Sequence, residues 1–120
     1  MEKYIEVMKQ SLELTETMLQ GLQHIQKLIG EGKHEQTIIT FEDVLSAYST
    51  IENSIKPIKD KLECEQQTST NLNHILELVV NRYEEKDYYK VQEVMQFTLI
   101  PQVKKWKEEL ENTFHPYIVS

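Results

Sequence analysis

Glycine and proline are scarce along most of this chain. All three glycines lie at positions 21, 30 and 32, and the three prolines stand at positions 57, 101 and 116. Because these two residue types supply most tight turns, their scarcity after residue 32 excludes folds built from many short strands and hairpins. The sequence therefore predicts an all-α protein.

Cysteine and long apolar runs are also lacking. Cys64 is the single cysteine, so no disulfide can form within the chain, and a cytoplasmic location follows most simply. The first residues, Met1 to Glu6, lack the basic and apolar regions of a signal peptide, and no run approaches about 18 apolar residues. We expect neither secretion by a signal peptide nor a membrane span.

Basic residues are outnumbered, with 13 Lys and Arg against 20 Asp and Glu and a formal net charge of −7. This charge opposes non-specific attraction to nucleic acid or to an anionic membrane surface. The lysine cluster at residues 104–107 is followed at once by Glu108, Glu109 and Glu111 and is interpreted as a solvated face. We therefore expect no nucleic-acid and no membrane partner.

Apolar residues recur at helical spacing in two segments of the first half. Residues 3–29 carry two apolar stripes, one containing Met8 and the other Met18, and two stripes predict two packing neighbours. Residues 38–55 carry a single stripe that stops near Lys56-Pro57, because proline disfavours a helical conformation in the residue before it. Pro57 is predicted to open the next helix.

The second half predicts two further helices. Residues 58–83 keep helical periodicity but have a polar middle over 63–71, and one continuous helix is favoured over a break there. A fourth helix begins near Asp87, and its apolar stripe changes register around Pro101, which predicts a kink at Leu99–Pro101. The apolar tail, residues 114–120, either folds back onto the bundle or contacts a partner.

Two segments share the pattern L-x-H-I-x-x-L-[I/V], at residues 22–29 and 72–79, and each precedes a short polar link and another amphipathic helix. This similarity is typical of a duplicated αα-hairpin, although coincidence is an equal alternative. Four amphipathic helices joined by short links favour an antiparallel up-down-up-down bundle. We predict one domain over residues 1–120, with hairpins at 3–56 and 57–113.

The repeated histidines, His24 and His74, are candidates for paired metal ligands or a phosphorelay site. Both fall on the outer face of their helices, whereas metal ligands in a bundle project inward. The one Glu-x-x-His sequence, residues 31–34, lies in a glycine turn. The histidines are therefore interpreted as surface residues, and no metal or other cofactor is predicted.

Carboxylate pairs and the cysteine are the remaining candidates for catalysis. Three glutamate pairs could in principle bind magnesium, as in all-helical nucleotide pyrophosphohydrolases, but they scatter over outward positions: Glu13/Glu16, Glu84/Glu85 and Glu108/Glu109. Cys64 has Lys61 as its one nearby basic residue and is interpreted as a small apolar residue. No catalytic residue is predicted, and we expect a non-enzymatic protein.

Aromatic residues concentrate in the last 40 positions, and tyrosine and tryptophan often dominate protein interfaces. Their simplest role is to fill the core around the predicted kink. The alternative is a surface that binds a partner, formed by seven candidate residues: Tyr88, Tyr89, Phe97, Trp106, Phe114, Tyr117 and Ile118.

The polar links at residues 31–34 and 84–89 resemble the turns of tetratricopeptide-type hairpins, although the match covers the turns alone and the period differs. The size, acidity and glutamate-rich paired helices are similar to small bacterial flagellar export chaperones and to uncharacterised helical proteins of low-GC Gram-positive bacteria. These resemblances imply an adaptor or chaperone that offers a hydrophobic groove to a partner helix.

The leading hypothesis is thus a non-enzymatic helical adaptor or chaperone-like module with a protein partner, and a homodimer is possible. One alternative is a helical-bundle metal-binding protein or phosphohydrolase that uses the scattered carboxylates. Another is an acidic regulator that blocks a nucleic-acid-binding partner, against which the modest and dispersed charge argues.

Overall fold

A computed structural model describes residues 2–62 and 67–119, with side chains for 2–62 and 71–119. The described residues form helices joined by short turns, so the all-α prediction is confirmed. The elements are α1 (Glu2–Gly30), α2 (Gln36–Leu62), α3 (Gln67–Glu84), α4 (Tyr88–Val94), the π-helical turn η1 (Met95–Leu99) and α5 (Ile100–Ile118). None of these helices is both long and apolar enough to cross a membrane.

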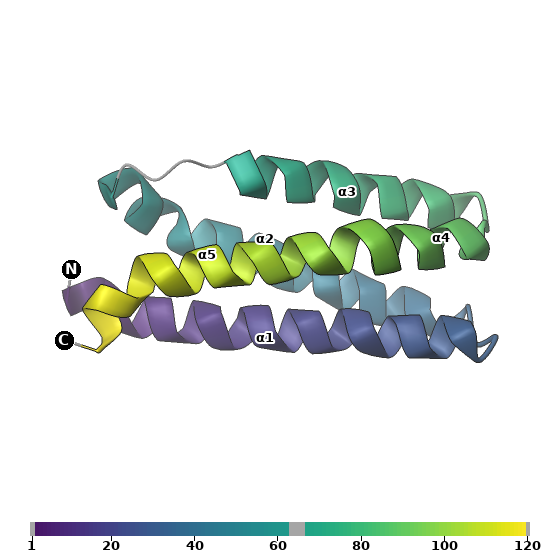
Figure 1. Cartoon of the computed structure of the whole chain (residues 1–120), viewed down its shortest axis with the longest axis horizontal. Helices are drawn as coiled ribbons and strands as arrows, with labels where there is room; N and C mark the ends of the chain where they lie inside the picture. Colours follow the sequence, from purple (N-terminus) through teal and green to yellow (C-terminus); the bar gives the residue numbers. More distant parts are fainter. Residues whose placement is uncertain (1, 63–66, 120) are drawn as a thin grey trace.

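The elements form four antiparallel rods, because α4, η1 and α5 follow one another along a single axis (Figure 1). Each rod runs opposite to the one before it, which confirms the up-down-up-down bundle. The first rod, α1, packs along both α2 and α5, and α3 packs on the α4–α5 rod. The two apolar stripes of α1 therefore serve the two neighbours that the sequence predicts.

The two hairpin turns, between α1 and α2 and between α3 and α4, begin with the same backbone geometry at the helix end, although the first link is longer. Gly32 and Lys86 occupy the left-handed region with φ of 79° and 59°. The next residue in each turn, Lys33 or Asp87, donates its N–H to the carbonyl five residues earlier, at 2.9 and 3.0 Å. This pattern is a Schellman motif, which satisfies carbonyls left free at a helix end. Common descent of the two hairpins remains a prediction.

The predicted helix end at Pro57 is wrong, because α2 continues through the proline to Leu62. Ile55 and Ile58 are both fully buried, so one apolar face continues across the proline. Pro57 itself is exposed, as is Asn53, whose carbonyl loses its helical donor. Burial of Ile58 and solvation of that carbonyl offset the roughly 3 kcal/mol that proline costs inside a helix. The first hairpin therefore extends beyond residue 56.

The single helix predicted over residues 58–83 is also wrong. Residues 58–62 belong to α2 and residues 67–84 to α3, and these two helices run in opposite directions (Figure 1). A polar segment has no apolar face that could pack on the bundle, and the direction of the chain changes within the predicted polar middle. Residues 63–66 of that middle, including Cys64, lie outside the described residues.

The predicted change of register in the fourth rod takes the form of the π turn η1 (Met95–Leu99), and the kink predicted at Leu99–Pro101 stays a prediction. Ile100 donates its N–H to the carbonyl of Met95, five residues earlier. The buried residues Val91, Met95, Leu99 and Val103 are four apart, a spacing that would drift by about 120° around a regular α-helix. The π turn absorbs this drift, and Pro101 follows it in the first turn of α5.

The predicted tail at residues 114–120 is not a separate segment, because α5 runs to Ile118. Phe114 is fully buried and joins the core, and Ile118 packs against it. Of the two roles predicted for the tail, the structure shows the one in which it packs on the bundle.

Candidate functional site

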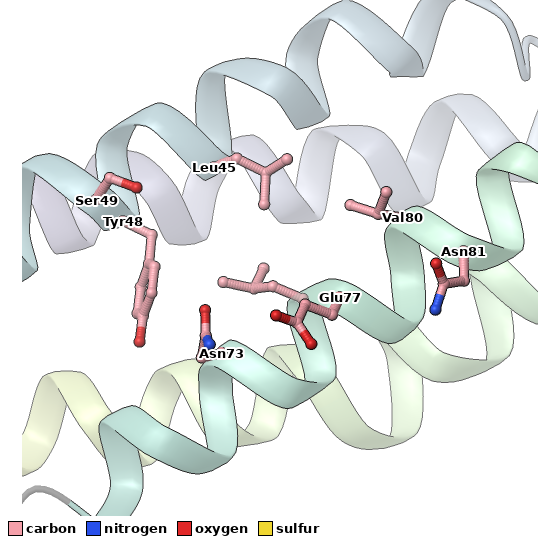
Figure 2. A pocket seen from close by; sticks show the side chains of 8 residues that line it. Leu45, Tyr48, Ser49, Asn73, Glu77, Val80 and Asn81 are labelled. Carbon is pink, nitrogen blue, oxygen red and sulfur yellow. The ribbon is translucent and has the colours of Figure 1, made fainter.

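The α2–α3 side is the least closely packed side of the bundle. Helix α3 lies against α4, η1 and α5 but approaches α2 at few positions. A cleft of about 270 Å³ separates the two helices, and Figure 2 shows side chains from both converging on it. We call this feature the α2–α3 groove, and eight residues line it: Leu45, Tyr48, Ser49, Asn73, Leu76, Glu77, Val80 and Asn81.

The α2–α3 groove has an apolar floor and a polar rim. Tyr48 and Leu76 are buried at its base. Leu45 and Val80 are half-buried and face each other from α2 and α3 (Figure 2). The rim consists of exposed polar side chains from both helices: Ser49, Asn73, Glu77 and Asn81. This arrangement can receive an apolar side chain at its centre while its edges remain solvated.

Tyr48 gives the groove a rigid base. Its ring lies tilted against the ring of Trp106 in α5, with a centroid separation of 5.5 Å. Burial, with a smaller contribution from the nearby carboxylate of Glu52, raises the pKa of the Tyr48 phenol well above its ordinary value. The phenol therefore remains neutral at physiological pH and places no charge at the base of the groove.

Ile38 extends the apolar surface toward the hairpin-turn end of the bundle. It stands seven residues before Leu45, so both side chains lie on the same side of α2. Its side chain is 37% exposed, although the sequence predicts it in the core stripe. Thr37 is buried in its place and accepts a hydrogen bond from Tyr83, at 2.8 Å, while donating to the carbonyl of His34. The apolar face of α2 is thus rotated by one residue at its start.

The seven predicted partner-binding residues divide into buried and exposed sets. Trp106 and Phe114 are 1% and 0% exposed, so their predicted role at a surface is corrected: they fill the core, as the simpler interpretation holds. Tyr117 and Ile118 are half-buried against that core. Composition cannot distinguish these roles, because the face of α5 on which each ring lies depends on the register after η1.

Tyr89 and Phe97 remain available at the surface, at 75% and 71% exposure. Tyr88 is half-buried and stacks on His34, with the rings 4.6 Å apart and 5° from parallel. This stack joins the two hairpin turns at one end of the bundle and has a structural role. The ring of Phe97 is exposed because η1 turns it away from the buried line through Met95 and Leu99.

The repeated histidines His24 and His74 are both exposed, which confirms the prediction that they face outward. Within the described residues, no group of three His, Cys, Asp or Glu side chains is placed to hold a metal ion. Of the predicted carboxylate pairs, Glu16 makes an ion pair with Lys107 at 3.2 Å and Glu85 with Arg82 at 2.6 Å. These glutamates bind lysine and arginine side chains of the bundle itself.

Comparison with known families gives a match to the domain of unknown function DUF8042 over residues 6–109. The chain belongs to this family. No curated protein matches the sequence, and no solved structure matches the fold. All eight groove residues lie within the matched stretch, whereas Phe114, Tyr117 and Ile118 lie outside it.

The α2–α3 groove was missed by sequence reasoning. Leu45 belongs to the apolar stripe predicted over residues 38–55, and Val80 follows Val79 of the apolar stripe predicted over residues 58–83. One signal was present: three polar residues, Asn73, Glu77 and Asn81, follow at four-residue spacing along one side of α3. A polar line beside an apolar one marks the edge of a helix that lacks a close neighbour.

Proposed function

We propose that this protein is a helical protein-binding module that holds an amphipathic helix of its partner in the α2–α3 groove. One observation carries the proposal: the bundle leaves an apolar floor open between two helices, edged by polar side chains from both. A helix that inserts apolar side chains at spacings of three and four would complete the packing of this side. We expect the module to act as an adaptor or chaperone in the cytoplasm.

The groove has dimensions that suit a short helical segment. Its lining on α3 runs from Asn73 to Asn81, which corresponds to about 12 Å of helix. Val80 and Leu45 stand partly exposed on opposite walls, so an inserted side chain contacts apolar atoms on both sides. We place the partner in this groove rather than on the aromatic surface of the fourth rod, because Trp106 and Phe114 of that rod are buried.

Site-specific photo-cross-linking in cells that express the protein tests this proposal. A photoreactive amino acid is placed at Ser49 or Asn73 on the groove rim, and at His24 or Phe97 as matched exposed controls on other faces. All four side chains are exposed, so the variants should fold alike. We expect a discrete protein adduct from the groove positions, with the cross-linked peptide of the partner identified by mass spectrometry as an amphipathic helix.

Three outcomes would contradict the proposal. An adduct from Phe97 alone would place the partner on the fourth rod, and the absence of any adduct from Ser49 and Asn73 would leave the groove without a partner. Equal adducts from all four positions would indicate non-specific collision and would also count against it.

A further inference from the structure

One carboxylate on the rim of the α2–α3 groove, Glu77, and two that flank the groove, Glu42 and Glu84, have no ion-pair partner in the described part of the chain. Glu42 stands four residues after Ile38 and three before Leu45, on the groove side of α2. Glu77 lines the groove and Glu84 follows seven residues later on the same side of α3. All three glutamates are exposed, and none has an ion-pair partner among the residues that the structure describes.

The sequence of both walls explains why these charges remain unpaired. Neither residues 36–55 of α2 nor residues 71–81 of α3 contain a lysine or an arginine. Two of the cations beyond these stretches form ion pairs of their own: Lys59 lies 3.7 Å from Glu52, and Arg82 lies 2.6 Å from Glu85. The groove therefore has a negative potential along its length.

The opposite seam of the bundle, between α1 and α5, shows the contrast. There Lys107 lies between two carboxylates, at 3.2 Å from Glu16 and 2.6 Å from Glu111. These contacts raise the pKa of the Lys107 ammonium group and keep it charged. The α1–α5 seam thus places a lysine between carboxylates of both helices, whereas the lining of the α2–α3 groove contains a carboxylate and no lysine or arginine.

We infer that the occupant of the α2–α3 groove is a basic amphipathic helix, with apolar side chains against Leu45 and Val80 and lysine or arginine side chains facing Glu42 and Glu77. This inference rests on the proposed function and specifies its partner. A second copy of this chain would bring a net charge of −7 to an acidic rim and is disfavoured by repulsion. The partner segment is therefore a different and basic sequence.

A displayed library of helical 14-residue peptides tests the charge of the partner. The library keeps apolar residues at positions 4, 7, 8 and 11 and allows lysine or glutamate with equal frequency at the flanking positions. It is selected separately on the unmodified protein and on three double variants. One variant removes groove charge (Glu42→Gln with Glu77→Gln), one removes equal charge elsewhere (Glu108→Gln with Glu109→Gln), and one removes apolar wall contacts (Leu45→Ser with Val80→Ser).

We expect lysine to be enriched at the flanking positions on the unmodified protein and on the Glu108/Glu109 variant, and not on the Glu42/Glu77 variant. Selected peptides should bind the Glu42/Glu77 variant about tenfold more weakly, because two partly exposed ion pairs are lost. They should also lose affinity for the Leu45/Val80 variant, whose fold is checked by circular dichroism.

Different results would overturn this inference and the proposed function. The selected peptides could show no preference for lysine but still depend on Leu45 and Val80 for binding. This result would overturn the inference that the partner is basic, and the groove would still be a helix-binding site. Equal weakening by the Glu108/Glu109 variant would indicate general attraction to an acidic protein and overturn the inference. Absence of any enriched peptide would overturn it as well, while cross-linking from Ser49 decides the proposed function independently.

Discussion

Burial raises the pKa values of two tyrosines, Tyr48 in the core and Tyr83 packed against it, above the ordinary value of 10.0. The phenol of Tyr48 lies at the base of the α2–α3 groove, and that of Tyr83 is held by Thr37 beneath the hairpin turns. Charging either group would place a phenolate in a desolvated site. The stability of the fold therefore depends on pH in the alkaline range, where these tyrosines lose their protons.

The sign of this coupling follows from the direction of the shifts. Above pH 10 the unfolded chain loses the tyrosine protons while the folded protein keeps them, so the free energy of unfolding falls as the pH rises. Each tyrosine contributes at most about 1.4 kcal/mol per pH unit. We expect the double variant Tyr48→Phe with Tyr83→Phe to lose stability less steeply between pH 10 and 12, as measured by urea denaturation. Tyr89→Phe, at an exposed ring, is the control, and an equal change of slope from it would refute the assignment.

The sequence alone predicted correctly whether some side chains are buried or exposed, and it did not do so for others. His24 and His74 were placed correctly because a polar residue opposite an apolar stripe has no reason to be buried. Trp106 and Phe97 were treated alike, although one is in the core and the other on the surface. The difference depends on the register of the helix at each position, and that register is set by backbone geometry in η1 rather than by the side chains themselves.

Helix boundaries were predicted well where glycine ends a helix and poorly where proline stands inside one. The turn at Gly32 was predicted from local chemistry, since glycine adopts a positive φ without strain. Pro57 suggested a boundary on the same local grounds, but the burial of Ile58 on the far side of it keeps α2 helical. A proline penalty of roughly 3 kcal/mol is comparable to the gain from burying one large apolar side chain, so tertiary packing decides the outcome.

The π turn η1 leads to a prediction about the packing of the fourth rod. Removing one residue within it changes the spacing of the buried line to 4, 3 and 4, which a regular α-helix keeps on one face. We expect deletion of Phe97, an exposed residue, to convert η1 to α-helix and to change the free energy of unfolding by less than about 1 kcal/mol. Chemical denaturation followed by circular dichroism measures this change.

Deletion of Lys104, which is also exposed but lies in the regular part of α5, is the matched control. It should rotate every later buried residue, including Trp106 and Phe114, by about 100° away from the core and strongly destabilise the bundle. Equal destabilisation by the two deletions would show that η1 does not simply accommodate one extra residue.

The groove is a property of the whole molecule and explains why the sequence predicted the bundle but not the site. Apolar periodicity determines which face of each helix is buried, and four such faces are sufficient to predict an antiparallel bundle. The distance between α2 and α3 depends on how α3 packs on the α4–α5 rod, and this packing involves residues far apart in the sequence. Leu45 and Val80 therefore resemble ordinary core residues until both helices are placed.

Uneven packing also predicts uneven local stability across the bundle. Among the described side chains, α3 has three fully buried apolar residues, Leu72, Leu76 and Val79, whereas α1 packs along two neighbours. Local opening requires less free energy where fewer apolar contacts are broken. We expect amide hydrogen exchange, measured by mass spectrometry, to be faster in α3 than in α1 for the protein alone.

A peptide bound in the α2–α3 groove should slow exchange in α3 and in the facing part of α2 more than elsewhere, because opening of α3 must then break the new contacts as well. Exchange in α1 provides the internal reference, since it forms no part of the groove. Uniform protection of all four rods before binding would contradict the uneven packing. Slowing confined to the fourth rod around Tyr89 and Phe97 would instead locate the bound helix on the aromatic surface, and the α2–α3 groove would then lose its role in the function of this protein.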